Sequence, residues 1–219
     1  MSSAVKRVLF GLIVLSIWEG LYLLRFWPPT LFPSPLEVLH ALGDGVWRGG
    51  YLEGVAVSLR RIGIGYILSI IVGLQIGILL AWSRTLEETV GATIVSLQTL
   101  PSICWLPLAI LWFGLSPTAI QFVVVMGALP SILIATDNGI RNIAPVYLRA
   151  ARTMGVNGFD LYRRVIFPAA LPSIVTGMKM AWAFAWRSLM AGELLFVSSG
   201  LGYLLEMGRE LNDMAQVIA

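Results

Sequence analysis

The sequence has little charge and few of the side chains on which catalysis or metal binding depends. Only 12% of its 219 residues are charged, against about 25% in an ordinary soluble domain. Its one cysteine, Cys104, excludes a disulfide framework and a thiolate metal site, and no partner lies near the lone His40. The net charge of +3 is too small to indicate a nucleic-acid partner. The phosphate-binding pattern G-x-x-x-x-G-K-[ST] is absent, so we expect neither ATP hydrolysis nor another enzymatic activity from this chain.

Long apolar runs are what the sequence has instead, and 58% of the residues are hydrophobic. Runs of this length are typical of helices that cross a bilayer. We therefore expect an all-α polytopic membrane protein with one transmembrane domain over residues 1–219. Five spans are visible, and the last residues resemble the start of a truncated sixth from 214 onward. The predicted spans are residues 8–24, 62–82, 90–115, 116–137 and 171–197.

The first apolar run has two interpretations. Lys6 and Arg7 before an apolar stretch are also typical of a secretory signal peptide. However, Glu19 interrupts the run and no small-residue cleavage site follows it. The pattern favours an uncleaved first span.

Two local patterns concern how helices begin and pack. In residues 31–61, which we expect on the outer membrane surface, Ser34-Pro35 is typical of a helix start and Gly49-Gly50 of a break. In the second span Gly73 and Gly77 share one helix face, which permits close approach of a neighbouring helix. This pattern predicts packing, not a ligand.

Prolines interrupt the third span. Pro101 and Pro107 each remove a backbone donor, and a broken helix persists in a bilayer only beside protein or a water-filled cavity. We expect this span to be bent or discontinuous. A transport path and a kinked packing helix remain open as explanations.

Basic residues predict the orientation. The loop 138–168 holds five arginines against one acid, Asp160, and the positive-inside rule places it in the cytoplasm. Counting back through four spans puts the N-terminus inside as well. Four arginines then fall outside, in partial conflict with the rule: Arg25, Arg48, Arg60 and Arg61.

The same loop has the pattern of two short helices joined at a glycine. Pro145 suits a first helical position, and Gly155 suits a left-handed stop. Asn157 with Asp160 predicts a capping box for the second helix, and Pro168 is expected to end that helix. A structured cytoplasmic loop of this kind favours a protein partner. A solvated basic loop at the lipid headgroups is the alternative.

The spacing of this loop resembles the coupling motif of ABC importer permeases, E-A-A, three residues, G, nine residues, I-x-L-P. Here Arg149-Ala150-Ala151 is followed by Gly155 and then by Val165-Ile166-Phe167-Pro168, with the spacing kept and the acid replaced by Arg149. Other segments resemble the nitrate/sulfonate/taurine/bicarbonate branch of the binding-protein-dependent transport system inner-membrane component family, among them 31–35, 58–61, 105–108, 111–114 and 167–172. The core of the resemblance covers residues 62–213. The resemblance implies that the following residues couple to an ATPase: Arg149, Ala150, Ala151, Arg152, Gly155, Phe159, Val165, Phe167 and Pro168.

The resemblance also implies an assembly in the bacterial inner membrane. Two permease copies, expected to be identical, would form the path, and two ATP-binding subunits would hold ATP and Mg. A periplasmic or lipid-anchored solute-binding protein would deliver a small solute, expected to be an anion such as an organosulfonate, nitrate or bicarbonate. No cofactor or metal is expected in this chain.

Polar residues inside the spans are the candidates for the path, because charge within a membrane is usually functional. We name Arg187, Glu193 and Gln98. Arg187 and Glu193 are about 240° apart on a helix and are not expected to pair. Arg187 suits an anionic solute or a partner on another helix, and Gln98 suits a hydrogen bond between helices better than a solute contact. The alternative function, an ATPase-independent secondary transporter or channel, would need facing intramembrane acids or an inverted repeat, and neither is evident.

Overall fold

The computed structural model describes residues 2–47, 49–196 and 199–219, apart from the side chain of Phe196. In these ranges every regular element is helical, which confirms the all-α prediction. The α-helices are α1 Ser3–Leu23, α2 Pro35–Trp47, α3 Tyr51–Trp82, α4 Arg84–Leu86, α5 Ala92–Gln98, α6 Leu106–Phe113, α7 Pro117–Arg141, α8 Pro145–Thr153, α9 Gly158–Leu161, α10 Phe167–Phe196, α11 Leu201–Glu210 and α12 Met214–Ile218. Two π-helical turns, η1 Glu87–Gly91 and η3 Tyr162–Ile166, and one 3₁₀ turn, η2 Ser102–Trp105, lie between them.

Two compact units make up the chain. The first comprises Met1–Ser58 with Val197–Ala219, and the second, which contains loop 138–168 and the three candidate path residues, comprises Leu59–Phe196. Within the first unit Ser34 and Glu37 form the predicted start of α2: the Ser34 Oγ accepts from the Glu37 backbone at 3.1 Å and the Glu37 carboxylate accepts from the Ser34 backbone at 2.8 Å. The predicted break at Gly49-Gly50 separates α2 from α3.

Three helices in the described ranges are long and apolar enough to cross a bilayer: α3, α7 and the continuous helix Gly158–Leu195. The segments Arg84–Gln98 and Ser102–Phe113 form a fourth candidate that is bent by 103°. This bend, next to Pro101, confirms the predicted discontinuity of the third span. The length and composition of the helices thus support three or four spans, against the five expected. The difference lies in α1. Every 18-residue stretch of this helix contains three charged residues, Lys6, Arg7 and Glu19, whereas a membrane span carries few or no charges. The last residue of the predicted fifth span, Val197, lies outside the described residues.

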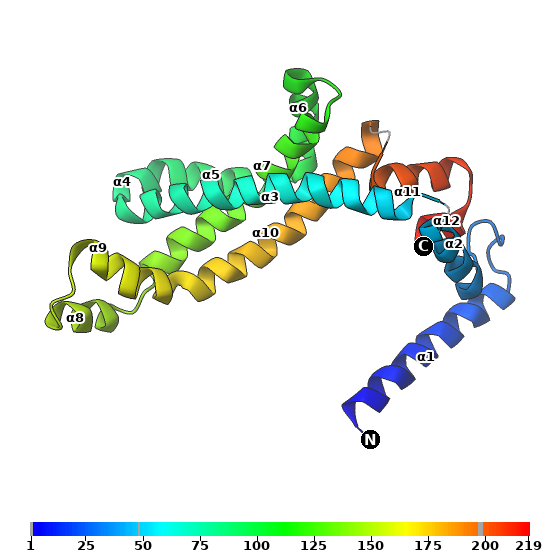
Figure 1. Cartoon of the computed structure of the whole chain (residues 1–219), viewed down its shortest axis with the longest axis horizontal. Helices are drawn as coiled ribbons and strands as arrows, with labels where there is room; N and C mark the ends of the chain where they lie inside the picture. Colours follow the sequence, from blue (N-terminus) through cyan, green and yellow to red (C-terminus); the bar gives the residue numbers. More distant parts are fainter. Residues whose placement is uncertain (1, 48, 197–198) are drawn as a thin grey trace. The chain divides into compact units, whose positions relative to one another are not determined.

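In the second unit α3, α7 and α10 pack against one another. Gly73 and Gly77 of α3 lie against Ile132 and Thr136 of α7, as the sequence predicted. On a neighbouring face of α7 Gly177 of α10 makes close contact, where an added Cβ would meet Ala135. Small residues allow this close approach. Because lipid is as apolar as the helix surfaces, the association of the helices depends on van der Waals contacts rather than on the hydrophobic effect. Figure 1 shows α7 and α10 running alongside each other, with α8 and α9 at their common end.

The contact at Gly77 makes a testable prediction. A Cβ there would lie 2.7 Å from the Thr136 Cβ and 2.8 Å from the Leu133 carbonyl oxygen. Gly77→Ala should therefore lower the free energy of unfolding by about 1–3 kcal/mol, as overpacking does. Gly63→Ala is the matched control on the same helix, since nothing lies within 4 Å of a Cβ there. Thermal unfolding in detergent measures both variants, and equal melting temperatures would contradict the tight α3–α7 contact.

Candidate coupling hairpin and transport path

Within loop 138–168, α8 and α9 form a helical hairpin whose two arms meet at Gly155. The first arm, α8, ends as the sequence predicted. Gly155 has a φ of +80°, in the left-handed region that favours glycine. The Val156 backbone donates to the Ala151 carbonyl and the Gly155 backbone donates to the Arg152 carbonyl, each at 3.0 Å. These two bonds form a Schellman motif, which satisfies carbonyls at the end of α8. The turn between the two arms is therefore well defined.

The predicted capping box of the second arm is wrong. Asn157 occupies the cap position, but its side chain does not cap the helix: the Nδ2 donates instead to the Gly155 carbonyl at 3.3 Å. Asp160 forms an ion pair with Arg164 at 3.5 Å within its own helix. The physical reason is that the Asn157 amide faces back toward the turn, so the reciprocal geometry of a capping box does not arise.

The prediction that Pro168 ends the second helix is also wrong. The helix runs continuously from Gly158 to Leu195, through α9, the π-turn η3 and α10. Pro168 lies in the first turn of α10, directly after η3. A π-turn inserts an extra residue and shifts the hydrogen-bond register, so a proline there costs less than in a regular helix interior. The second arm of the hairpin is thus a direct extension of a membrane span.

The hairpin combines exposed apolar side chains with arginines. Met154 is 82% and Phe159 76% exposed. Among the predicted coupling residues, Ala151 is buried, Val165 is half-buried, and the others are exposed, namely Arg149, Ala150, Arg152, Gly155, Phe159, Phe167 and Pro168. Leu148 anchors the opposite side of α8 on a cluster formed by Ile143, Ala170 and Ile174. An anchored helix with exposed apolar residues is typical of an interaction surface.

A cavity of about 380 Å³ brings two of the predicted path residues together. Arg187 of α10 and Gln98 of α5 both line it, with Ser102 from the bent segment. The Arg187 guanidinium lies 5.5 Å from the centre of the Phe184 ring. Gln98 donates to the Ser131 hydroxyl at 3.1 Å, which is the bond between helices that the sequence left as an alternative. The cavity offers a small solute one cation and several neutral polar groups.

A second cavity of about 520 Å³ shares Gln98 with the first. Its polar lining consists of neutral groups: Gln98, Ser131, Asn138, Ser173 and Thr176. Sequence reasoning named only the glutamine. The signal for the others is the spacing of small polar residues, seven apart on α7 and three apart on α10, which places each pair near one helix face.

Glu193, the third predicted path residue, does not line either cavity. Its carboxylate forms an ion pair with Arg61 of α3 at 2.8 Å, and both residues are buried. Glu193 and Arg187 do not pair with each other, as their spacing indicated. Sequence reasoning missed the role of Arg61, because the two partners are 132 positions apart and no local pattern connects them.

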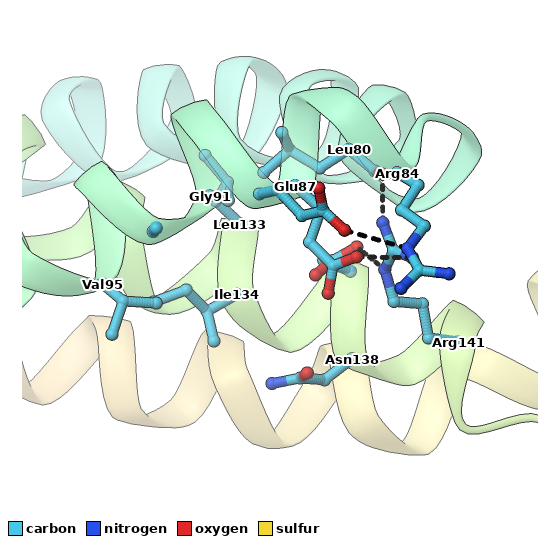
Figure 2. A pocket seen from close by; sticks show the side chains of 12 residues that line it. Leu80, Arg84, Glu87, Gly91, Val95, Leu133, Ile134, Asn138 and Arg141 are labelled. Carbon is cyan, nitrogen blue, oxygen red and sulfur yellow. Dashed lines mark hydrogen bonds and ion pairs between the residues drawn. The ribbon is translucent and has the colours of Figure 1, made fainter.

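Arg141 forms a further charged cluster, which sequence reasoning used only to orient the loop. Its Nε donates to Asp137 at 2.7 Å, its Nη1 lies 2.9 Å from the Glu87 carboxylate, and its Nη2 donates to the Leu80 carbonyl. These groups border a cavity of about 600 Å³. Figure 2 shows Arg141 reaching from α7 toward Glu87 and toward Leu80, which lies near the end of α3.

Comparison with known proteins finds matches over most of the chain. Residues 67–219 match the model of the binding-protein-dependent transport system inner membrane component family. A relative from Methanocaldococcus jannaschii, named as an ABC transporter permease protein, is 31% identical over 98% of this chain and 82% of its own length. A relative from Escherichia coli K12, named as an aliphatic sulfonates transport permease, is 34% identical over 90% of this chain and 75% of its own length. Other relatives are named as taurine and nitrate transport permeases.

The fold also matches a solved structure. A chain of the MetNI methionine ABC transporter in an inward-facing form aligns with a TM-score of 0.64 at 21% identity. The alignment covers 76% of this chain and 86% of that chain. At this identity the likeness concerns the fold alone.

Proposed function

The chain belongs to the binding-protein-dependent transport system inner membrane component family and is the permease subunit of an ABC transporter, and from this premise we propose that it imports a small oxyanion or sulfonate. The observation that carries the proposal is Arg187 at the cavity that Gln98 and Ser102 also line. Guanidinium groups remain charged at any physiological pH and bind planar or tetrahedral oxyanions through paired hydrogen bonds. Relatives are named for sulfonate, taurine and nitrate, which all carry such a group.

The proposed energy source is a pair of ATP-binding subunits that dock on the hairpin α8–α9. The exposed side chains of Met154 and Phe159 support this, because they offer apolar contact area on a turn with a defined backbone. Arg149 and Arg152 beside them favour an acidic partner surface. The second arm continues into α10, so a displacement of the hairpin passes into the helix that carries Arg187.

The proposed assembly has two copies of this chain, two ATP-binding subunits and a solute-binding protein on the outer side. ATP and Mg are bound by the ATP-binding subunits. The hairpin and the N-terminus lie in the cytoplasm, because the five arginines of residues 138–168 follow the positive-inside rule.

Uptake into proteoliposomes tests the proposal. The complex, purified with its ATP-binding subunits and supplied with its solute-binding protein, should take up radiolabelled taurine, ethanesulfonate or nitrate only when ATP is present. Arg187→Gln should lower this uptake by about tenfold to a hundredfold, since a hydrogen bond to a charged group contributes about 1.5–3 kcal/mol. Lys179→Gln, an exposed cation on the same helix, is the matched control and should leave uptake unchanged.

Two results would contradict the proposal. Uptake that continues without ATP would indicate a secondary transporter or channel. ATP-dependent uptake of maltose or putrescine, with none of the three anions transported, would show that the path selects a neutral or cationic solute.

A further inference from the structure

Arg141 joins three separate segments of the second unit. It is the last residue of α7, and its guanidinium contacts Leu80 at the end of α3, Glu87 in the π-turn η1 and Asp137 one turn earlier on α7. All three guanidinium nitrogens are engaged. Such use of the whole planar group is specific to arginine, because a lysine ammonium presents a single point of charge.

Arg141 lies between the hairpin and the bent segment. Only residues 142–144 separate it from Pro145, where the hairpin begins. On the other side Glu87 lies at the beginning of the bent segment, whose residues Gln98 and Ser102 line the cavity at Arg187. The Arg141–Glu87 ion pair therefore connects the base of the hairpin with the segment that borders the path (Figure 2).

Packing differs on the two sides of α7. Against α3 and α10 the helix is in close contact, since an added Cβ at Gly77 or at Gly177 would clash with α7. Between α7 and the segment α4–η1–α5 lies instead the cavity of about 600 Å³, with Gly91 and Val95 on one wall and Ile134 on the other. Close-packed elements move together, whereas elements separated by a cavity are held by the contacts that cross it. At this end of the bent segment the crossing contact is the ion pair.

We propose that Arg141 is a positioning residue that transmits movement of the hairpin to the bent segment through its ion pair with Glu87. The inference rests on the proposed function, because it requires an ATP-driven partner on the hairpin. When the hairpin moves, α7 and Arg141 move with it. The ion pair between Arg141 and Glu87 then displaces η1 in the same direction. The π-turn is a suitable hinge, since such turns interrupt the regular hydrogen-bond ladder of a helix.

Native Cys104 is a reporter for this movement. It is the single cysteine of the chain, it is exposed, and it lies in η2 of the bent segment. Its rate of labelling by a hydrophilic maleimide is measured in nanodisc complexes containing the ATP-binding subunits, without nucleotide and after trapping with ATP and vanadate. In the wild type we expect the two rates to differ at least about fivefold, the lower end of typical coupling between sites.

Glu87→Gln and Arg141→Gln should abolish most of this difference while ATP hydrolysis continues. Glu88→Gln is the matched control: it follows Glu87 directly, its side chain is 64% exposed, and it forms a 2.9 Å ion pair with Arg84 one turn earlier. It should behave as the wild type. A purely structural role of Arg141 would lower the amount of assembled complex without removing the nucleotide dependence of the labelling.

The proposal is overturned if Glu87→Gln keeps the full nucleotide-dependent change, or if Glu88→Gln loses it equally. It is also overturned if Cys104 in the assembled wild type reacts at one rate in both states. Co-purification of the ATP-binding subunit is measured in every sample. Failure of the wild-type chain to bind that subunit would instead contradict the proposed function.

Discussion

A chain that lacks residues 149–155 should reach the membrane and bind no ATP-binding subunit. The deletion removes the second half of α8 and the turn at Gly155, and with them the exposed Arg149, Ala150 and Arg152. The apolar spans that direct membrane insertion are untouched. Co-purification with the tagged ATP-binding subunit measures the effect, and membrane fractionation checks insertion.

A point substitution separates loss of contact from loss of local structure. Met154→Asp changes one side chain that is 82% exposed and leaves the Schellman turn in place. Interface residues of this kind contribute about 1–2 kcal/mol, so binding should weaken by about tenfold. The matched control is Leu211→Asp, also an exposed apolar residue, which follows the fifth predicted span and which the predicted topology places on the outer side. If the deletion variant co-purified with as much ATP-binding subunit as the wild type, the coupling role of the hairpin would be contradicted.

The buried pair formed by Arg61 and Glu193 predicts the largest change in stability. Glu193→Leu removes the carboxylate 2.8 Å from Arg61 and leaves the guanidinium without that partner in the helix bundle. Breaking one side of a buried ion pair costs about 3–5 kcal/mol of unfolding free energy. Thermal unfolding of the purified protein in detergent measures the loss.

Replacement of both partners provides the decisive comparison. Arg61→Met combined with Glu193→Leu should recover most of the lost stability, because an apolar pair of similar volume needs no compensating charge. The matched control is Glu206→Leu, which removes an ion pair with Arg209 that is largely exposed on its arginine side. Exposed pairs contribute at most about 1 kcal/mol, so this variant should unfold near the wild-type temperature. A double variant as unstable as Glu193→Leu would show that the ion pair is not the source of the effect.

Local signals in the sequence were sufficient for much of the hairpin. Pro145 begins α8 and Gly155 ends it, because a proline at a first helical position and a glycine in the left-handed region each act within one turn. The same kind of signal failed at Pro168. There the π-turn η3 shifts the backbone hydrogen-bond register of the helix, and no local residue pattern predicted this turn.

The candidate path was only partly predictable. Arg187 and Gln98 were named because polar groups are rare inside apolar spans, and the structure brings both to one cavity. Their common cavity depends on the bend of 103° between Arg84–Gln98 and Ser102–Phe113. Pro101 predicted that a bend exists, but not its size or direction, which neighbouring helices determine.

By itself the sequence determined the class of the protein, most of its helical segments and the two-armed loop, since hydropathy, prolines and glycines act over neighbouring residues. The tertiary structure alone decided which charges meet. Glu193 pairs with Arg61 across 132 positions, and Arg141 reaches Leu80 across 61. Such contacts depend on the rotation and register of packed helices, to which every buried side chain contributes and which no single segment encodes.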